Sequence, residues 1–154
     1  MIFCTFAGHR EVFGNDIEKQ VGAVIENMLR TDRKFVFYSG DMGQFDKECA
    51  VAVRSAKRTH PELDISLIAV LPYITNFLNT NKSYYENYFD DIIIPTELTG
   101  VYYKKAILCR NQWLVDHSNL LIAYVYRNFG GAYTTLKYAA RKNKKIINIA
   151  DIYK

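Results

Sequence analysis

The chain has 154 residues, of which 49% are hydrophobic and 23% are charged. These proportions match one globular domain with a single core and exclude a disordered chain. The net charge of +4 comes from 20 basic and 16 acidic residues, and the basic residues are dispersed except for the cluster at 141–145. That cluster is expected at the end of the last helix, where cations complement the helix dipole, and it is too short for a nucleic-acid-binding stripe. We therefore do not expect nucleic acid to be the main partner.

The cysteines Cys4, Cys49 and Cys109 are far apart, and each lies in an apolar stretch. This usage is typical of buried free thiols in a reducing compartment. No spacing among the cysteines and histidines resembles a zinc site, and we predict neither a metal nor a cofactor. The chain begins with no basic leader and contains no apolar run near the roughly 18 residues of a membrane span. We expect a cytoplasmic protein that does not associate with membranes.

Strand-like and helix-like segments alternate along the chain. In order, the expected elements are a strand over 2–7, a helix over 17–29, a strand over 35–38, a helix over 44–59, strands over 65–71 and 91–95, a helix over 102–117, a strand over 119–126, a helix over 134–142 and a strand over 145–149. Residues 75–88 are polar and rich in tyrosine, and we predict a loop with room for one helical turn. The helix over 102–117 has apolar residues on several faces and is expected to pack on more than one side.

The expected strands are runs of Val, Ile, Leu and Phe without polar alternation, which is the pattern of a parallel sheet covered on both faces. We therefore predict a Rossmann-like three-layer α/β/α sandwich with a mostly parallel sheet of about six strands. The sequence shows no repeat or linker, so we expect a single domain over 1–154.

Two glycine-bearing loops lie where a hydrophobic strand gives way to a helix, at residues 39–46 and 130–135. In a parallel sheet such turns lie at the carboxyl edge, where amides at the helix N-terminus attract anions. The sequence thus predicts a phosphate-bearing ligand between the two loops.

In the second loop, Gly130 and Gly131 would let the backbone approach a phosphate closely, and the hydroxyl groups of Thr134 and Thr135 would add donors. The alternative is a tight turn in which threonine caps the helix. We favour ligand binding.

In the first loop, ligand contacts are expected from Ser39, Gly40 and Gly43, which could wrap a ribose or phosphate. Asp41 or Asp46 could accept hydrogen bonds from sugar hydroxyl groups, since each carboxylate oxygen accepts more than one donor. Alternatively, Asp46 and Glu48 merely occupy the first turn of a helix, where negative charge is favourable.

Three more candidates lie outside these loops. Arg10 follows the first strand and could clamp a phosphate with its guanidinium group. His9 beside it could bind the ligand or shuttle a proton, although a histidine at a strand end is more often a local hydrogen-bonding residue. Arg110 lies in the middle of a helix and needs a carboxylate or a ligand as its partner.

Five motifs occur in a characteristic order. They are Ala7-Gly8-His9-Arg10, the loop 39–46, Leu71-Pro72-Tyr73, Arg110-Asn111 continuing to Asp116, and Gly130-Gly131 with Thr134-Thr135. Together they resemble the YpsA-like branch of the SLOG superfamily, which also includes the DNA-processing protein DprA and the LOG phosphoribohydrolases. The resemblance implies a Rossmann-like pocket for nucleotides or their derivatives at the carboxyl edge. It also implies that Gly8 and Asn111 contribute to ligand binding and that Asp46 faces the pocket.

The sequence departs from the LOG enzymes at the second glycine loop. There the LOG motif continues to a glutamate that works on the sugar, whereas this chain has Lys137 at about that position. Cleavage of an N-glycosidic bond builds positive charge on the ribose, which a lysine would oppose. We therefore favour a ligand-binding sensor or carrier.

Two alternatives remain. One is a hydrolase of a nucleotide-type N-glycosidic bond, with Asp46, Glu48 and Arg110 as the catalytic residues. The other is a DprA-like binder of single-stranded nucleic acid, which would need a continuous basic groove lined with aromatic residues. Homo-oligomerisation is a further possibility, because the aromatic stretches 84–89 and 102–103 are expected to be exposed.

Overall fold

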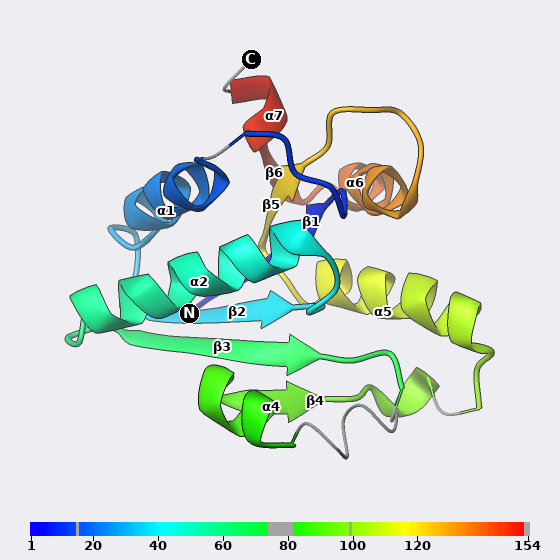
Figure 1. Ribbon diagram of the computed structural model, residues 1–154, viewed down its shortest axis with the longest axis horizontal. Coiled ribbons are helices and arrows are strands. Elements are labelled where there is room, and N and C mark those ends of the chain that lie inside the picture. The colour runs from blue at the N-terminus through cyan, green and yellow to red at the C-terminus, as the bar shows by residue number, and fades with distance from the viewer. Residues whose placement is uncertain (15, 74–81, 99, 153–154) are drawn as a thin grey trace.

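The computed structural model describes residues 1–14, 16–73, 82–98 and 100–152. In chain order, its elements are β1 (Ile2–Gly8), α1 (Ile17–Met28), β2 (Lys34–Ser39), α2 (Gln44–Thr59), β3 (Asp64–Val70), α4 (Lys82–Tyr88), β4 (Asp91–Ile93), the 3-10 helix η1 (Thr96–Leu98), α5 (Tyr103–Asp116), β5 (Leu120–Tyr124), α6 (Gly131–Arg141), β6 (Lys145–Asn148) and α7 (Ile149–Ile152) (Figure 1). Among these residues, no helix is both long and apolar enough to cross a membrane.

The strands form one sheet in the order β4-β3-β2-β1-β5-β6, and every neighbouring pair is parallel. This confirms the predicted α/β fold with a six-stranded parallel sheet. The chain leaves β1 toward β2 on one side and later returns to pair β5 on the other side. In such sheets the crevice for a ligand opens at the carboxyl ends of the strands where the order reverses, which here means the ends of β1 and β5.

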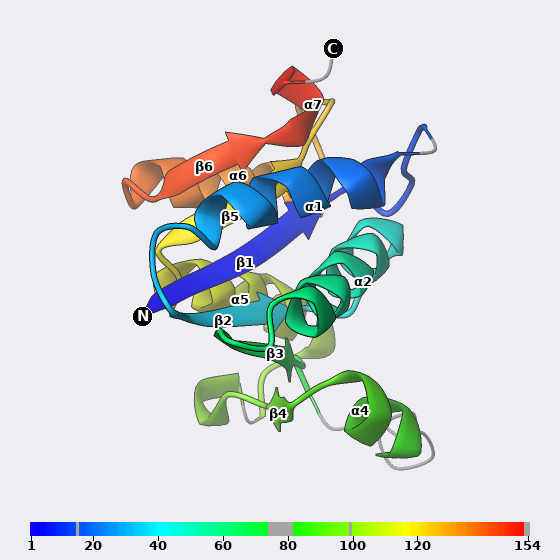
Figure 2. The same ribbon diagram turned by 90° about the vertical axis from the view of Figure 1, so that its left-hand side faces the viewer.

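Alternate residues of each strand point to opposite faces of the sheet, and each face has its own helices (Figure 2). On one face, Cys4 and Phe6 pack in the cluster that contains the buried residues of α1 and α2. On the other, Ala7 packs with residues of α6, and Val36 packs with Leu114 of α5. Because both faces are covered, the strands carry few polar side chains, which explains their unbroken apolar runs.

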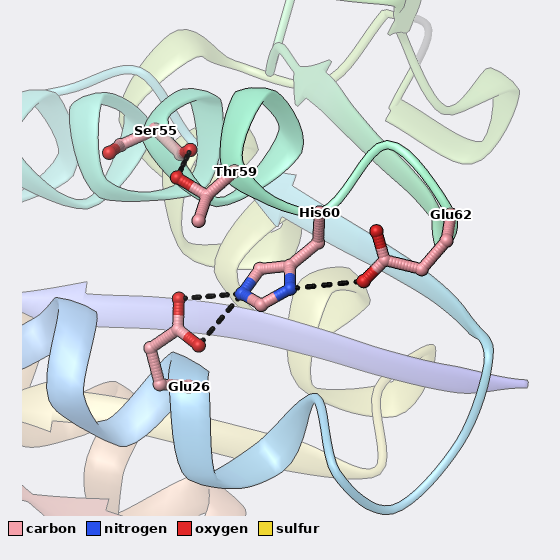
Figure 3. Close-up of polar contacts among 5 residues, drawn as sticks. All are labelled: Glu26, Ser55, Thr59, His60 and Glu62. Atoms are coloured by element: carbon pink, nitrogen blue, oxygen red, sulfur yellow. Dashed lines mark hydrogen bonds and ion pairs between the residues drawn. The ribbon is translucent and has the colours of Figure 1, made fainter.

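A histidine fastens α1 to α2 at the end of α2 remote from the glycine loop (Figure 3). His60 follows α2, and its Nε2 lies 2.8 Å from Glu26 Oε2 on α1, while its Nδ1 lies 3.2 Å from Glu62 Oε1. Thr59, the residue before His60, donates from its hydroxyl group to the Ser55 carbonyl at 2.9 Å within α2. Of these contacts, the one between His60 and Glu26 joins the two helices.

Two elements differ from the expectation. Residues 82–88, expected as a loop, form the helix α4, because Tyr85 and the following Phe89 bury their rings in the main core. The rest of that expected loop, 75–81, lies outside the described residues. After β6 the chain forms a short helix, α7, whose first residue Ile149 is fully buried. Both α4 and α7 form because a few apolar side chains are buried in the tertiary structure. The sequence periodicity of these segments does not predict that burial.

The helix α5 packs on more than one side, as expected: Leu114 lies in the cluster with Val36 of the sheet, whereas Val115 lies in the cluster with Ala139 of α6. The expected surroundings of two other segments need correction. Cys109 is partly exposed, whereas the other two cysteines are buried. Within the aromatic stretch 84–89, Tyr85 and Phe89 are buried whereas Tyr88 is 47% exposed, and Tyr102 and Tyr103 are 66% and 50% exposed. Homo-oligomerisation through the exposed rings stays a prediction.

Candidate functional site

A cleft of about 410 Å³ opens at the carboxyl ends of β1, β2 and β5, where the strand order reverses. Among the sequence candidates, it is lined by Gly8, His9, Arg10, Gly40, Asp46, Arg110, Asn111, Gly131 and Thr135. These residues come from strand ends, loops and helices up to 127 positions apart in the chain, and they meet at the edge where the parallel strands end.

Gly8 ends β1 and supports the cleft through packing. A Cβ atom at this position would overlap the Phe45 side chain of α2, which is fully buried. The absence of a side chain therefore lets α2 approach the end of β1. Gly8 lines the cleft, but its structural role is to set the height of α2 above the sheet.

His9 is buried, with 3% of its surface exposed, and its Nε2 has no hydrogen-bond partner among the described residues. The ring packs edge-on against Tyr126 at a centroid distance of 4.4 Å. Burial, with a smaller contribution from the charge of Arg127, lowers the pKa of His9, so the ring is neutral near pH 7. A buried polar atom without a partner is uncommon in native proteins, and here it belongs to a residue that lines the cleft.

Arg10 follows His9 and remains exposed at the mouth of the cleft. Its backbone carbonyl accepts the amide of Gln44, the first residue of α2, at 3.2 Å, and its Nη2 lies 3.5 Å from Met42 Sδ. Gly43 caps α2 with φ +92°, a conformation that favours glycine. The Arg10 guanidinium group is thus held near the first glycine loop with most of its donors still available.

Asp46 lies in the first turn of α2, and its Oδ2 accepts the backbone amide of Met42 at 3.0 Å. Burial raises the pKa of this carboxyl group to about 6, although the Met42 amide and the charge of Arg110 both act to lower it. Asp46 therefore titrates near neutral pH inside the cleft. Glu48, its proposed catalytic companion, does not line the cleft.

The described hydrogen bonds of Arg110 at 2.9 Å go to backbone carbonyl groups and an amide oxygen, and because its side chain also lines the cleft, its contact with a ligand stays a prediction. Its Nη1 donates to the carbonyl groups of Gly40 and Val70, both at 2.9 Å, and its Nε donates to Asn111 Oδ1 at 2.9 Å. Burial lowers its pKa, and the nearby Asp46 charge partly opposes that effect. Arg110 is therefore mainly a brace that joins the ends of β2 and β3, and only part of its guanidinium group faces the cleft.

The helix α6 begins at Gly131, three residues before the predicted start. Its cap, Gly130, has φ +97° and does not line the cleft, whereas Gly131 and Ala132 do. The first amides of a helix have no carbonyl group one turn earlier to bond, so this end of α6 presents donors and a positive dipole to the cleft.

The two threonines of α6 are not free donors, which corrects their expected role. Thr134 Oγ1 donates to the Gly130 carbonyl at 3.0 Å, and Thr135 Oγ1 donates to the Gly131 carbonyl at 2.9 Å. Both hydroxyl groups thus bond within the first turn, as threonine commonly does inside helices. Thr135 lines the cleft, and the exposed Thr134 does not.

Sequence reasoning missed Arg127, which lies in the loop between β5 and α6 and lines the cleft. Its guanidinium carbon stands 4.6 Å from the centre of the Phe129 ring and 5.6 Å from that of Tyr126. The signal was present, because a cation three positions before a predicted anion-binding glycine pair is a natural phosphate contact.

A second cavity, of about 830 Å³, adjoins the first and shares Gly40 and Met42 with it. We call it the tyrosine cavity, because its described lining includes Tyr73, Tyr84, Tyr85 and Tyr88. Asp41 and Gly43 line this cavity and not the cleft.

The backbone of the first glycine loop explains this placement. Asp41 has φ +48°, and its amide donates to Ser39 Oγ at 3.0 Å. Its carboxylate turns toward the tyrosine cavity, where Tyr84 Oη donates to Asp41 Oδ1 at 3.2 Å. Ser39 is buried and lines neither cavity.

Comparisons with known proteins place the fold. No protein-family model matches the chain, and no curated protein matches it. Among solved structures, the chain is similar to DNA processing protein A (DprA) from Streptococcus pneumoniae, with a TM-score of 0.65 and 15% identity over 94% of this chain. It is also similar to DprA from Helicobacter pylori, in a study of that protein's single-stranded DNA binding, with a TM-score of 0.62 and 14% identity over 94% of this chain. The fold is therefore that of the DprA proteins' Rossmann-like part.

The similarity covers 49% of the Streptococcus protein and 63% of the Helicobacter protein, so this chain spans less than two thirds of either relative. At such low identity the match establishes the shared fold.

Proposed function

We propose that the cleft binds a nucleotide or nucleotide-derived ligand through its phosphate and sugar, and that the protein acts as a sensor or carrier. One observation carries the proposal: His9 lines the cleft, and its buried Nε2 has no hydrogen-bond partner among the described residues. A neutral imidazole nitrogen in this position can accept from a sugar hydroxyl group or donate to a phosphate oxygen.

The charges around His9 support an anionic ligand. The N-terminus of α6 supplies unbonded amides and a positive dipole, and Arg10 and Arg127 reach the cleft from the ends of two different strands. Guanidinium groups suit phosphate because they donate two parallel hydrogen bonds. Asp46, in contrast, suits the sugar, since a carboxylate accepts the hydrogen bonds of a diol.

The absence of a second acid near α6 favours binding over turnover. Lys137 is exposed and stands 6.0 Å from the centre of the Tyr133 ring, away from the lining of the cleft. The described acids of the cleft are Asp46 and Glu11, and neither comes from the loop that carries the LOG glutamate. We propose that the chain belongs to the YpsA-like branch of the SLOG superfamily, on the order of its motifs and on its DprA-like fold.

The proposal is tested by calorimetric titration of the purified protein with AMP and with ribose 5-phosphate. We expect both to bind, and we expect Arg127→Ala to weaken both about ten-fold, because the charge that it removes contacts the shared phosphate. Arg30→Ala, an exposed arginine at the end of α1, is the matched control and should leave both affinities unchanged. If neither compound binds, the proposal is wrong. Release of free adenine from AMP would favour the hydrolase instead.

A second candidate is binding of single-stranded nucleic acid, which a specific surface feature favours. Phe129 is 61% exposed and lies beneath the Arg127 guanidinium group, next to the cleft, so a cation and an aromatic face are offered together. Such pairs bind the phosphates and bases of single strands. A labelled deoxythymidine oligomer, followed by anisotropy at low salt, tests it: saturable binding that Phe129→Ala weakens would support this function, and no binding at low salt would exclude it.

A further inference from the structure

We propose that the base of the bound nucleotide lies in the tyrosine cavity, so that the ligand extends from the cleft past Gly40 and Met42, which line both cavities. This inference rests on the proposed function and adds to it where the base goes and which base is preferred. It assigns a role to the larger cavity, which the phosphate and sugar contacts leave unused.

The first step is the chemical difference between the two cavities. The described lining of the cleft contains three arginines and two acids but no tyrosine or tryptophan, and its one phenylalanine, Phe6, is 3% exposed. A base held there would find no ring to stack on. The tyrosine cavity adjoins the cleft at Gly40 and Met42, and its volume of about 830 Å³ is twice as large.

The second step is the state of the aromatic rings. Tyr88 is 47% exposed, and its ring carries the Arg54 guanidinium group at 5.0 Å from the centroid. Tyr84 lies 5.2 Å from Tyr88 between ring centres, which places two aromatic faces along one wall. Flat aromatic ligands stack on such surfaces, whatever their hydrogen-bonding groups.

The third step is the carboxylate of Asp41, which gives the cavity a preference among bases. Asp41 holds a left-handed conformation, its Oδ1 accepts the hydroxyl group of Tyr84, and its carboxylate also accepts that of Tyr85. A carboxylate has about four acceptor positions, so it can also accept from an exocyclic amine. Adenine carries such an amine, whereas hypoxanthine carries a carbonyl oxygen at the same position and would be repelled. The geometry thus favours an aminopurine.

The exposed ring of Phe129 is the competing position for a base, but it lines neither the cleft nor the tyrosine cavity. We therefore expect this ring to contribute little to the binding of a mononucleotide.

Calorimetric titration with three probes, AMP, IMP and ribose 5-phosphate, tests the inference. In the wild type we expect AMP to bind at least about five-fold more tightly than ribose 5-phosphate, which is the lower range for stacking of one base. Tyr88→Ala should remove that gain and leave ribose 5-phosphate unaffected. Tyr103→Ala, which removes an equally exposed tyrosine from α5, should change neither affinity.

A second variant tests the role of the carboxylate. Asn tolerates the left-handed conformation as well as Asp does, so Asp41→Asn should fold normally and abolish the preference of the wild type for AMP over IMP. Equal affinities of the wild type for AMP and ribose 5-phosphate, or a loss of AMP binding in Phe129→Ala but not in Tyr88→Ala, would overturn this inference alone. Failure of ribose 5-phosphate and AMP alike to bind would overturn the proposed function and the inference with it.

Discussion

Arg110 and Gly40 form a contact that sets the shape of the cleft: the Nη1 of Arg110 donates to the Gly40 carbonyl at 2.9 Å and to the Val70 carbonyl at the same distance. A Cβ at position 40 would lie 3.1 Å from the guanidinium carbon, so the glycine admits the arginine. One buried cation thus braces the loops that follow β2 and β3, and it fixes the floor that both cavities share.

Arg110→Lys should therefore destabilise the protein. Lysine keeps the charge but cannot bond both carbonyl groups and Asn111 at once, and it leaves buried acceptors unpaired. We expect a loss of about 2 to 4 kcal/mol in the free energy of unfolding. Denaturant unfolding measures it, and Arg58→Lys, an exposed arginine on α2, is the control with no expected change. A variant as stable as the wild type would show that Arg110 is not a brace.

Two glycine-to-alanine substitutions distinguish the cost of steric overlap from the gain in helix preference. Gly8→Ala would force its methyl group into the Phe45 ring, and we expect a loss of about 2 kcal/mol or more in unfolding free energy. Gly22→Ala lies in α1, where a Cβ meets nothing within 4 Å. There we expect a gain of about 0.5 to 1 kcal/mol, because alanine favours the helix. Thermal or denaturant unfolding measures both variants. Equal changes in the free energy of unfolding for the two substitutions would contradict this explanation.

Asp46→Asn should raise stability at neutral pH. The folded-state pKa of Asp46, about 6, lies above the ordinary aspartate value of 3.8, so the folded protein binds its proton more tightly than the unfolded chain does. Stability is consequently lost as the pH rises from about 4 to 6, and the ionised group costs at most about 3 kcal/mol above that range. Asparagine carries no charge and can still accept the Met42 amide.

The expected signature is a pH-dependent difference between the two proteins. Asp46→Asn should exceed the wild type in unfolding free energy at about pH 7.5 and converge with it below about pH 4. A constant difference across this range would show that ionisation of Asp46 is not the cause. Asp46→Ala, which also loses the acceptor for Met42, should gain less than the asparagine variant.

His60→Gln tests the contact between α1 and the end of α2. The hydrogen bonds to Glu26 and Glu62 raise the pKa of His60 above the ordinary histidine value of 6.5. Its ion-pair contribution is therefore complete below about pH 6.5 and is lost as the pH rises through the higher folded-state value. We expect the variant to be less stable than the wild type near pH 6 and nearly equal to it near pH 9 in denaturant unfolding. A deficit that grows with pH would contradict this sign.

The sequence determined the fold, the order of the elements and the two loops of interest. Apolar runs such as Phe35–Tyr38 and Leu120–Tyr124 have the length and composition of buried parallel strands, and that signal is local, so it can be read without a structure. The limits of α2 were predicted to the residue because Gly43 and Pro61 bracket it.

Only the tertiary structure decided what each side chain does. Arg110 lines the cleft and also bonds backbone carbonyl groups 40 and 70 positions away, and the carboxylate of Asp41 accepts the hydroxyl group of Tyr84 outside the cleft. Burial of His9 without a partner, and the height of α2 set by Gly8, likewise depend on neighbours that are distant in the chain. Local pattern fixes where strands end, but the direction of a side chain at that edge follows from packing among all the loops that meet there.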